Sequence, residues 1–139
     1  MISFFVPGEP RAKQSFRANP NGRGFQTARV KSWQAEVGWA AQQQMHALSQ
    51  DLLTEDLRVS LTFHLPDRRR IDIDNLSKGV LDGLNGICWK DDHQIMDLHL
   101  HKRIALNREL CGVTVFIDCA SVAAEKEENL HAPIQPLGQ

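Results

Sequence analysis

The stretch Leu57-Arg-Val-Ser-Leu-Thr-Phe-His-Leu65 alternates apolar and polar side chains without interruption. Side chains of a strand point to opposite faces in turn, so this stretch predicts a β-strand with one face buried. The strand leads through Pro66 into the most highly charged part of the chain. We therefore expect the residues that follow it to be held accurately at its carboxyl end.

The next segment, Asp67-Arg-Arg-Arg-Ile-Asp-Ile-Asp-Asn-Leu-Ser-Lys78, brings cations and carboxylates together. Asp72 and Asp74 are two residues apart, so in an extended backbone both carboxylates lie on one face and a divalent ion could sit between them. An arginine run or an acidic helix cap taken alone is more often a solvated surface. Their conjunction indicates a site for phosphoryl chemistry, which needs phosphate-binding cations beside hard oxygen ligands for Mg²⁺.

Residues 75–84 predict an amphipathic helix, because apolar side chains recur with a period of 3.6 residues at Leu76, Val80, Leu81 and Leu84. Asp74 is placed to be its N-cap. Asp74, Lys78 and Asp82 are spaced four residues apart and form a polar column away from the apolar stripe. We expect this column to face solvent or a cleft.

Shorter patterns predict the remaining elements. Alternation predicts strands near residues 2–6, 96–101 and 113–117, and residues 102–110 are interpreted as a hairpin connection between the last two. Thr27 can cap a second helix that contains Trp33 and Trp39, which we interpret as core or dimer-contact residues. The order β, α, β, α, β, β predicts an α+β fold with a four-stranded mixed sheet and both helices packed against it.

A chain of 139 residues, 42% hydrophobic and 24% charged, is the size and composition of one soluble domain. We expect a folded domain over residues 1–119 and a disordered or loosely packed tail over 120–139, where large apolar residues are few. No apolar run approaches the roughly 18 residues that span a bilayer, and the amino terminus does not resemble a signal peptide. These features favour a cytoplasmic protein without a membrane partner.

The net charge of −1 hides an uneven distribution. Residues 71–139 hold six Lys and Arg against eleven Asp and Glu, whereas residues 11–31 hold six basic residues and no acidic one. A basic loop opposite an acidic pocket suits a metal-dependent nuclease, since the loop attracts phosphates and the pocket concentrates cations. The candidate DNA-binding residues are basic residues of this loop and of the arginine run: Arg11, Lys13, Arg17, Arg68, Arg69 and Arg70.

Other chemistry-bearing residues give weaker signals. The three cysteines are odd in number and lack C-x-x-C spacing, so reduced, buried thiols are favoured at Cys88, Cys111 and Cys119. His99 and His101 alternate on a predicted strand and could bind Zn²⁺. No third ligand has matching spacing, so an exposed strand face is the favoured interpretation.

Several separate blocks resemble the RusA family of Holliday-junction endonucleases from bacteria and their phages. They are Leu65-Pro-Asp-Arg-Arg-Arg-Ile-Asp-Ile-Asp-Asn-Leu-Ser-Lys78, Leu81-Asp-Gly-Leu84, Trp89-Lys-Asp-Asp-His-Gln94 and, more loosely, Pro7-Gly-Glu-Pro-Arg-Ala-Lys13. The resemblance implies a homodimer that binds four-way DNA junctions and cuts two opposed strands with Mg²⁺, for which Mn²⁺ can substitute. Carried over by motif, the family's three catalytic aspartates fall on Asp72, Asp74 and Asp92, and its lysine falls on Lys78.

The leading hypothesis is therefore a Mg²⁺-dependent endodeoxyribonuclease that resolves four-way junctions by paired nicks in recombination and repair. One alternative is a non-catalytic junction- or duplex-binding module whose aspartates are helix caps and counter-charges to the arginines. Another is a metal-dependent nuclease acting on flap DNA or RNA, because metal-bound carboxylates do not by themselves select a substrate.

Overall fold

The computed structural model describes residues 1–13 and 28–120. The described chain forms four strands and two α-helices, with a short 3-10 helix before and another after the third strand. In order they are β1 (Ile2–Pro7), α1 (Ala28–Ala47), β2 (Leu57–Leu65), α2 (Ile73–Leu84), η1 (Asp92–Gln94), β3 (Ile95–Ile104), η2 (Arg108–Leu110) and β4 (Gly112–Cys119). Both termini of β2 coincide with the ends of the alternating stretch that predicts it.

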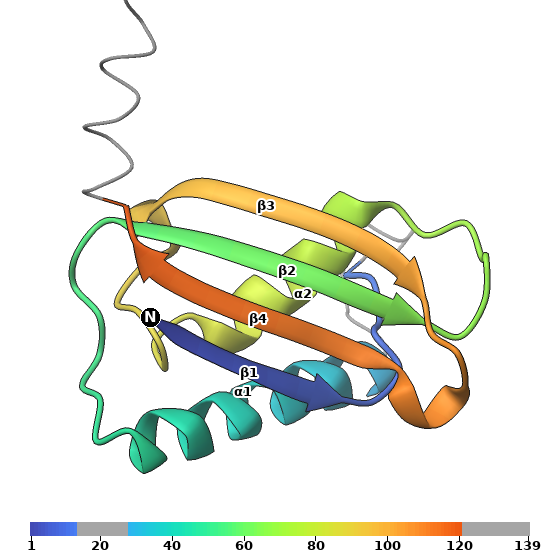
Figure 1. Ribbon diagram of the computed structural model, residues 1–139, viewed down its shortest axis with the longest axis horizontal. Helices are drawn as coiled ribbons and strands as arrows, with labels where there is room; N and C mark the ends of the chain where they lie inside the picture. The colour runs from blue at the N-terminus through green and yellow to red at the C-terminus, as the bar shows by residue number, and fades with distance from the viewer. Residues whose placement is uncertain (14–27, 121–139) are drawn as a thin grey trace, which may run out of the picture.

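The strands form one mixed sheet in the order β1-β4-β2-β3. β3 runs parallel to β2, whereas β4 is antiparallel to both β1 and β2 (Figure 1). The α+β prediction is confirmed, including the four-stranded mixed sheet with its two helices. The predicted hairpin at residues 102–110 is wrong, because β2 lies between β3 and β4 and the connection crosses the end of β2.

The core lies between the inner face of the sheet and the two helices. Every second residue of β2, from Leu57 to Leu65, is buried against them. α1 contributes Trp33, Val37, Ala41 and Met45, and α2 contributes Leu76, Val80 and Leu84. A Cβ added at Gly83 of α2 would lie 3.0 Å from the carbonyl oxygen of Gln34, so the close approach of the two helices requires glycine there.

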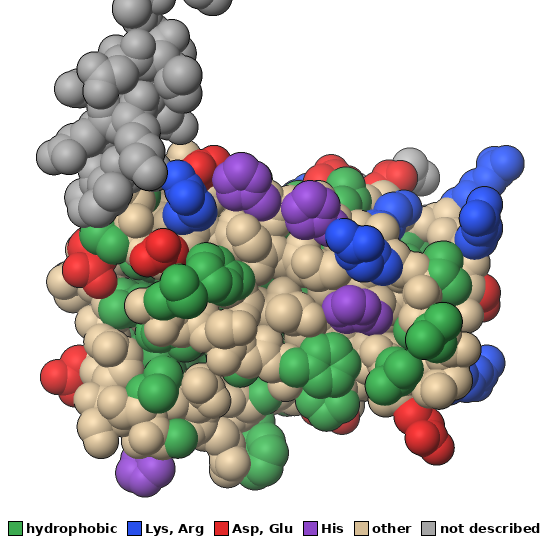
Figure 2. All heavy atoms as spheres, in the orientation of Figure 1, with side chains coloured by type: hydrophobic (Ala, Val, Ile, Leu, Met, Phe, Trp, Pro, Cys, Tyr) green, Lys and Arg blue, Asp and Glu red, His purple; other side chains and the backbone are tan. Residues whose placement is uncertain are grey.

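The opposite face of the sheet carries no helix of the described chain, and Figure 2 shows it with histidine and basic side chains gathered on the β3 side. β3 is an edge strand, and its apolar residues Met96 and Leu98 remain exposed. His99 and His101 are also exposed, as the strand-face interpretation predicts. No three candidate metal ligands gather in one place among the described residues, so these histidines have no third ligand within that part of the chain.

Several single-residue predictions are decided by burial. Trp33 is a core residue as predicted, whereas Trp39 is 64% exposed on the outside of α1. Cys88 and Cys111 are free thiols and are buried, as predicted, whereas Cys119 is only half-buried. None of the described helices is long and apolar enough to cross a bilayer.

Two further predictions concern the carboxyl-terminal tail and the basic loop. Ala120 is buried, and its N–H donates to the carbonyl oxygen of Asp56 at 2.9 Å, so the folded unit extends at least to this residue. The rest of the predicted tail, residues 121–139, lies outside the described residues. So do Thr27, Arg17 and most of the predicted basic loop.

Candidate active site

Asp72 and Asp74 lie together at the amino terminus of α2, where the chain turns after leaving β2. The helix begins at Ile73, so Asp72 is its N-cap and Asp74 lies in the first turn. The prediction that Asp74 is the cap is wrong by two residues, and the two carboxylates do not share an extended segment. Their position at the positive end of the helix dipole favours negative charge in this place.

The carboxylates of Asp72 and Asp74 are open to solvent. Asp72 has an extended backbone (φ −68°, ψ 131°) and makes no side-chain capping hydrogen bond. Among the hydrogen bonds and ion pairs of the described residues, none involves either carboxylate or the Lys78 ammonium. Asp74, Lys78 and Asp82 are all exposed on one side of α2, which confirms the predicted polar column. Two carboxylates and a cation are therefore free to meet a ligand.

Asp92 lies at the other end of the molecule. β2 and β3 are parallel, and Leu57 pairs with Ile95, so the turn before β3 adjoins the start of β2. Asp72 instead follows the end of β2, and the two sites flank α2 at opposite ends (Figure 1). A helix of 12 residues is about 18 Å long. One chain therefore brings Asp72 and Asp74 together but leaves Asp92 distant from them.

The turn that carries Asp92 is held by a network of hydrogen bonds. The buried Gln94 side chain accepts from the N–H of Asp91 and donates to the carbonyl oxygens of Leu53 and Glu55. The Asp91 carboxylate accepts from the N–H of His93, which completes a capping box and lowers the pKa of that carboxyl. Sequence reasoning missed the role of Gln94, although a capping residue followed three positions later by Gln is the pattern of this motif.

Carboxylates already pair with half of the predicted DNA-binding cations. The guanidinium of Arg69 donates two hydrogen bonds to Asp67 and one, of 2.6 Å, to Glu9. The hydrogen bond between Arg69 and Asp67 raises the pKa of the guanidinium and lowers the pKa of the carboxyl. Arg11 pairs with the second oxygen of Glu9 at 3.1 Å. The pair of Arg69 with Glu9 thus joins the amino-terminal segment to the loop before Asp72, whereas the pair of Arg11 with Glu9 lies within that segment.

Lys13 lies against α2 rather than free in solvent. The ammonium of Lys13 is 2.5 Å from a carboxylate oxygen of Asp82. The backbone N–H of Lys13 donates to the carbonyl oxygen of Asn75 at 3.0 Å. A Cβ at Gly79 would lie 3.2 Å from the carbonyl oxygen of Arg11, so the helix has no side chain where this segment crosses it. The end of the described amino-terminal segment is therefore anchored beside the Asp74 column.

Arg68 and Arg70 are the predicted cations that stay exposed without a described ion-pair partner. The structure adds Lys102, which comes from β3 and whose ammonium donates to the carbonyl oxygen of Ile71 at 2.8 Å. The sequence pattern does not identify Lys102, because only the parallel pairing of β3 with β2 brings its ammonium to Ile71, the residue before Asp72.

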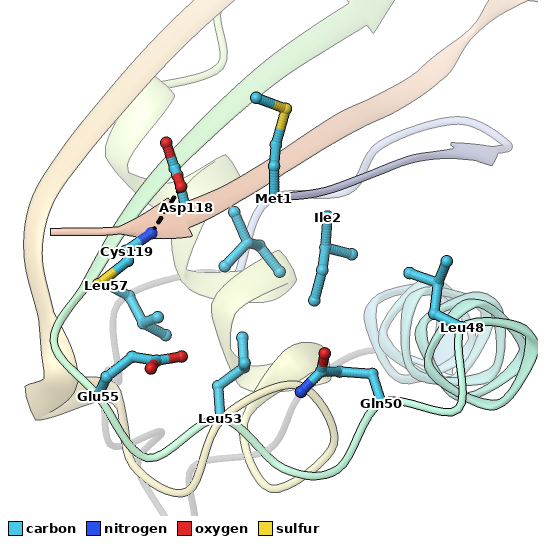
Figure 3. A pocket seen from close by; sticks show the side chains of 10 residues that line it. Met1, Ile2, Leu48, Gln50, Leu53, Glu55, Leu57, Asp118 and Cys119 are labelled. Atoms are coloured by element: carbon cyan, nitrogen blue, oxygen red, sulfur yellow. Dashed lines mark hydrogen bonds between the residues drawn. The ribbon is translucent and has the colours of Figure 1, made fainter.

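Two hollows of the described surface do not include Asp72 among the residues that line them. One, of 340 Å³, opens at the far end of the sheet among Met1, Leu53, Leu57 and Cys119 (Figure 3). A second, of 550 Å³, runs between α1 and α2 and reaches Asp82. Asp72, Asp74 and Lys78 are exposed on the described surface.

These features define a class of protein: a small α+β domain that presents exposed carboxylates and cations at a helix amino terminus, the donor set of metal-dependent enzymes that act on phosphodiesters. Comparison with known families is consistent with this class. The family described as Endodeoxyribonuclease RusA matches residues 7–118, and the chain belongs to this family.

Named relatives cover most of the chain. The crossover junction endodeoxyribonuclease RusA of Aquifex aeolicus is 30% identical over 119 residues, which is 84% of this chain and 90% of the relative. The protein of the same name from Escherichia coli K12 is 30% identical over 101 residues, 72% of this chain and 81% of the relative. That of Enterobacteria phage 82 is 30% identical over 98 residues, 70% and 78% of the two chains.

Proposed function

We propose that this protein is a crossover junction endodeoxyribonuclease, which resolves four-way DNA junctions by paired nicks during recombination and repair. Membership of the RusA family and the names of its relatives support this activity. The observation that carries the proposal is the group of Asp72, Asp74 and Lys78 on the exposed start of α2, whose charged groups have no partner among the described residues. DNA as the substrate also makes the cytoplasm the site of action.

The carboxylates of Asp72 and Asp74 fit a Mg²⁺ ion, for which Mn²⁺ substitutes, because both are exposed hard oxygen ligands without competing partners in the described chain. The ion supplies charge that polarises the scissile phosphate and lowers the pKa of bound water. Lys78 lies one turn along the same face, where its ammonium stabilises negative charge that develops on the phosphate.

Asp92 completes this site only in a dimer. The positions of Asp72 and Asp92 at opposite ends of α2 support this arrangement, since the carboxylate ligands of one ion lie about 2.0–2.6 Å from it. A two-fold axis near the middle of α2 reverses the helix direction and carries Asp92 of the partner subunit toward Asp72 and Asp74. The same symmetry places two sites on a junction that is itself approximately two-fold symmetric, which accounts for paired nicks.

The phosphates of the DNA arms contact the basic residues around this site. Arg68 and Arg70 are the primary contacts, because they are exposed and unpaired among the described residues. Arg11, Lys13 and Arg69 contribute less, because each already has a carboxylate partner. Arg17 remains a candidate contact.

Labelled four-way, flap and linear duplex DNA, each with and without Mg²⁺, test the proposal, and Asp74→Asn is the matched inactive variant. We expect symmetric nicks in the four-way junction that require the metal and disappear in Asp74→Asn while junction binding persists. Binding that is equal with Mg²⁺ or EDTA, without nicking, would identify a binding module instead. Faster cleavage of flap DNA than of the junction would assign a different nuclease.

A further inference from the structure

One oxygen of the Asp92 carboxylate is occupied by a buried indole. The Nε1–H of Trp89 donates to Asp92 Oδ1 at 2.7 Å, the length of a strong, charge-assisted hydrogen bond. Trp89 is completely buried, whereas Asp92 is half-buried and close to solvent. The hydrogen bond therefore runs from a rigid core residue to a carboxylate at the surface.

The indole itself has little freedom to move. The backbone of Trp89 forms bridges to Leu53 and Asn85, and its carbonyl oxygen accepts from the N–H of Gly86 at 2.8 Å. The Gln94 network fixes the other side of the turn. Both ends of the hydrogen bond are thus fixed relative to the sheet, so the bond sets the rotation of the carboxylate.

We propose that Trp89 is a positioning residue, which holds Asp92 Oδ1 so that Oδ2 is directed outward as a metal ligand. A carboxylate has lone pairs on both oxygens, so one can accept from the indole while the other binds a cation. Partners of this kind, which orient a ligand without touching the metal, typically contribute 10- to 100-fold in metal affinity or activity. This role rests on the proposed function of Asp92 as a ligand.

Trp33 provides a matched control within the same core. It is 3% exposed, comparable to Trp89, but its indole N–H has no hydrogen-bond partner in the described part of the chain. Replacing either residue by Phe removes an indole of the same size from a buried place. Only Trp89→Phe removes a hydrogen bond to a carboxylate, so a difference between the two variants reports the bond rather than the loss of volume.

The binding of Mn²⁺ to the dimer, followed by the electron paramagnetic resonance of the free ion, measures the effect without catalysis. We expect Trp89→Phe to weaken Mn²⁺ binding about 10-fold or more, and Trp33→Phe to leave it within about twofold. Cleavage by Trp89→Phe should need more Mg²⁺ for half-maximal rate and approach the parent rate at saturating Mg²⁺. Unchanged Mn²⁺ binding, or an equal loss in both variants, would overturn the positioning role.

Asp92→Asn separates this inference from the function on which it rests. If Asp92→Asn loses Mn²⁺ binding and Trp89→Phe does not, Trp89 has no positioning role but Asp92 remains a ligand. If Asp92→Asn binds Mn²⁺ as the parent does, both the ligand assignment and the positioning role are wrong.

A measurement on the parent protein keeps the test decisive if Trp89→Phe fails to fold. Paramagnetic Mn²⁺ broadens nuclear resonances of nearby protons, and the broadening falls steeply with distance. We expect the indole N–H resonance of Trp89 to disappear at lower Mn²⁺ than that of Trp33. Equal broadening of both resonances would contradict the proposed geometry.

Discussion

Asp74 and Lys78, near the start of α2, place two charges of opposite sign on one exposed face of the helix. Asp74 and Lys78 are four residues apart, a spacing at which a carboxylate and an ammonium can pair, yet they form no ion pair in this structure. An exposed pair of this kind contributes at most about 0.5 kcal/mol to stability. Stability therefore cannot account for Lys78, and its contribution should be sought in the reaction.

Lys78→Ala is expected to fold, dimerise and bind junctions within a few-fold of the parent, and to cleave about 100-fold more slowly or worse. The ammonium is lost from beside the scissile phosphate, while the buried stripe of α2 is untouched. Single-turnover cleavage with saturating enzyme measures the chemical step. A rate within about threefold of the parent would remove Lys78 from the active site.

Cys88 is a residue whose chemistry is set by its surroundings. Burial raises the pKa of its thiol to about 12, above its value in the unfolded chain. The resulting stabilisation is complete below the unfolded pKa, near 8.5, and is lost as the pH rises toward the folded pKa. We expect the free energy of unfolding to fall over this range by up to about 1.4 kcal/mol per pH unit for this group.

Denaturant titration of the parent and of Cys88→Ala at several pH values checks this prediction. Other groups titrate in the same range, so the difference between the two proteins isolates the thiol. The Cys88→Ala protein should be less stable near neutral pH, because it leaves a cavity, and the gap should narrow as the pH rises. A gap that stays constant up to pH 11 would contradict the assignment.

At the scale of elements, α2 is the part on which the site is assembled. Its buried side packs on the sheet, its first turn presents the carboxylates, and its glycine at position 79 admits residues 11–13. Gly normally costs about 1 kcal/mol relative to Ala inside a helix. The close approach of the amino-terminal segment explains why the chain carries Gly79 there.

Gly79→Ala should therefore destabilise the protein in spite of the better helix former. The new methyl group would meet the Arg11 carbonyl oxygen and displace the segment that pairs Lys13 with Asp82. We expect junction affinity to fall together with the free energy of unfolding. An increase in stability of about 1 kcal/mol, the value for a free helix surface, would show that the contact is unimportant.

The loop between β2 and α2 carries three adjacent arginines, of which Arg69 has carboxylate partners while Arg68 and Arg70 have none among the described residues. Replacing both Arg68 and Arg70 by Ala should reduce the slope of log affinity against log salt by about 0.9 for each lost phosphate contact. Arg69→Ala is the matched control, since its guanidinium is held by Asp67 and Glu9 and should change the slope less. Equal slopes for all three proteins would assign Arg68 and Arg70 to solvent.

At the scale of the whole molecule, the separation of Asp92 from Asp72 is the reason for proposing an active site shared by two chains. Asp72→Asn and Asp92→Asn should each be inactive alone, and Asn at the cap position preserves the helix start. In a mixed dimer, one site unites the intact Asp72 of one subunit with the intact Asp92 of the other. We therefore expect mixing the two inactive proteins to restore nicking of one strand.

This complementation is measured on labelled junctions as the formation of products that carry a single nick. The control is a mixture of Asp72→Asn with Asp74→Asn, because both substitutions affect the same group of ligands and no mixed dimer contains an intact site. If neither mixture regains activity although the subunits exchange, each site belongs to one chain and the two-chain assignment is wrong.

Local sequence patterns are sufficient to predict many of the secondary-structure elements of this protein. Alternation and helical periodicity depend on neighbouring residues only, so they predict β2, α2 and the exposed column from Asp74 to Asp82. The order of the predicted strands and helices along the chain also predicts the α+β class. The start of α2 was misplaced by two residues, because Asp72 and Asp74 are equally good caps and the choice between them depends on how the loop leaves the sheet.

Long-range arrangement depended on the packed molecule. The hairpin prediction failed because the position of β3 on the far side of β2 is set by burial of the sheet, not by the residues of the connection. The same topology separates Asp92 from Asp72, brings Lys102 to Ile71 and pairs Arg69 with Glu9. These contacts and separations involve residues that are far apart in the sequence, and local periodicity carries no information about such pairs.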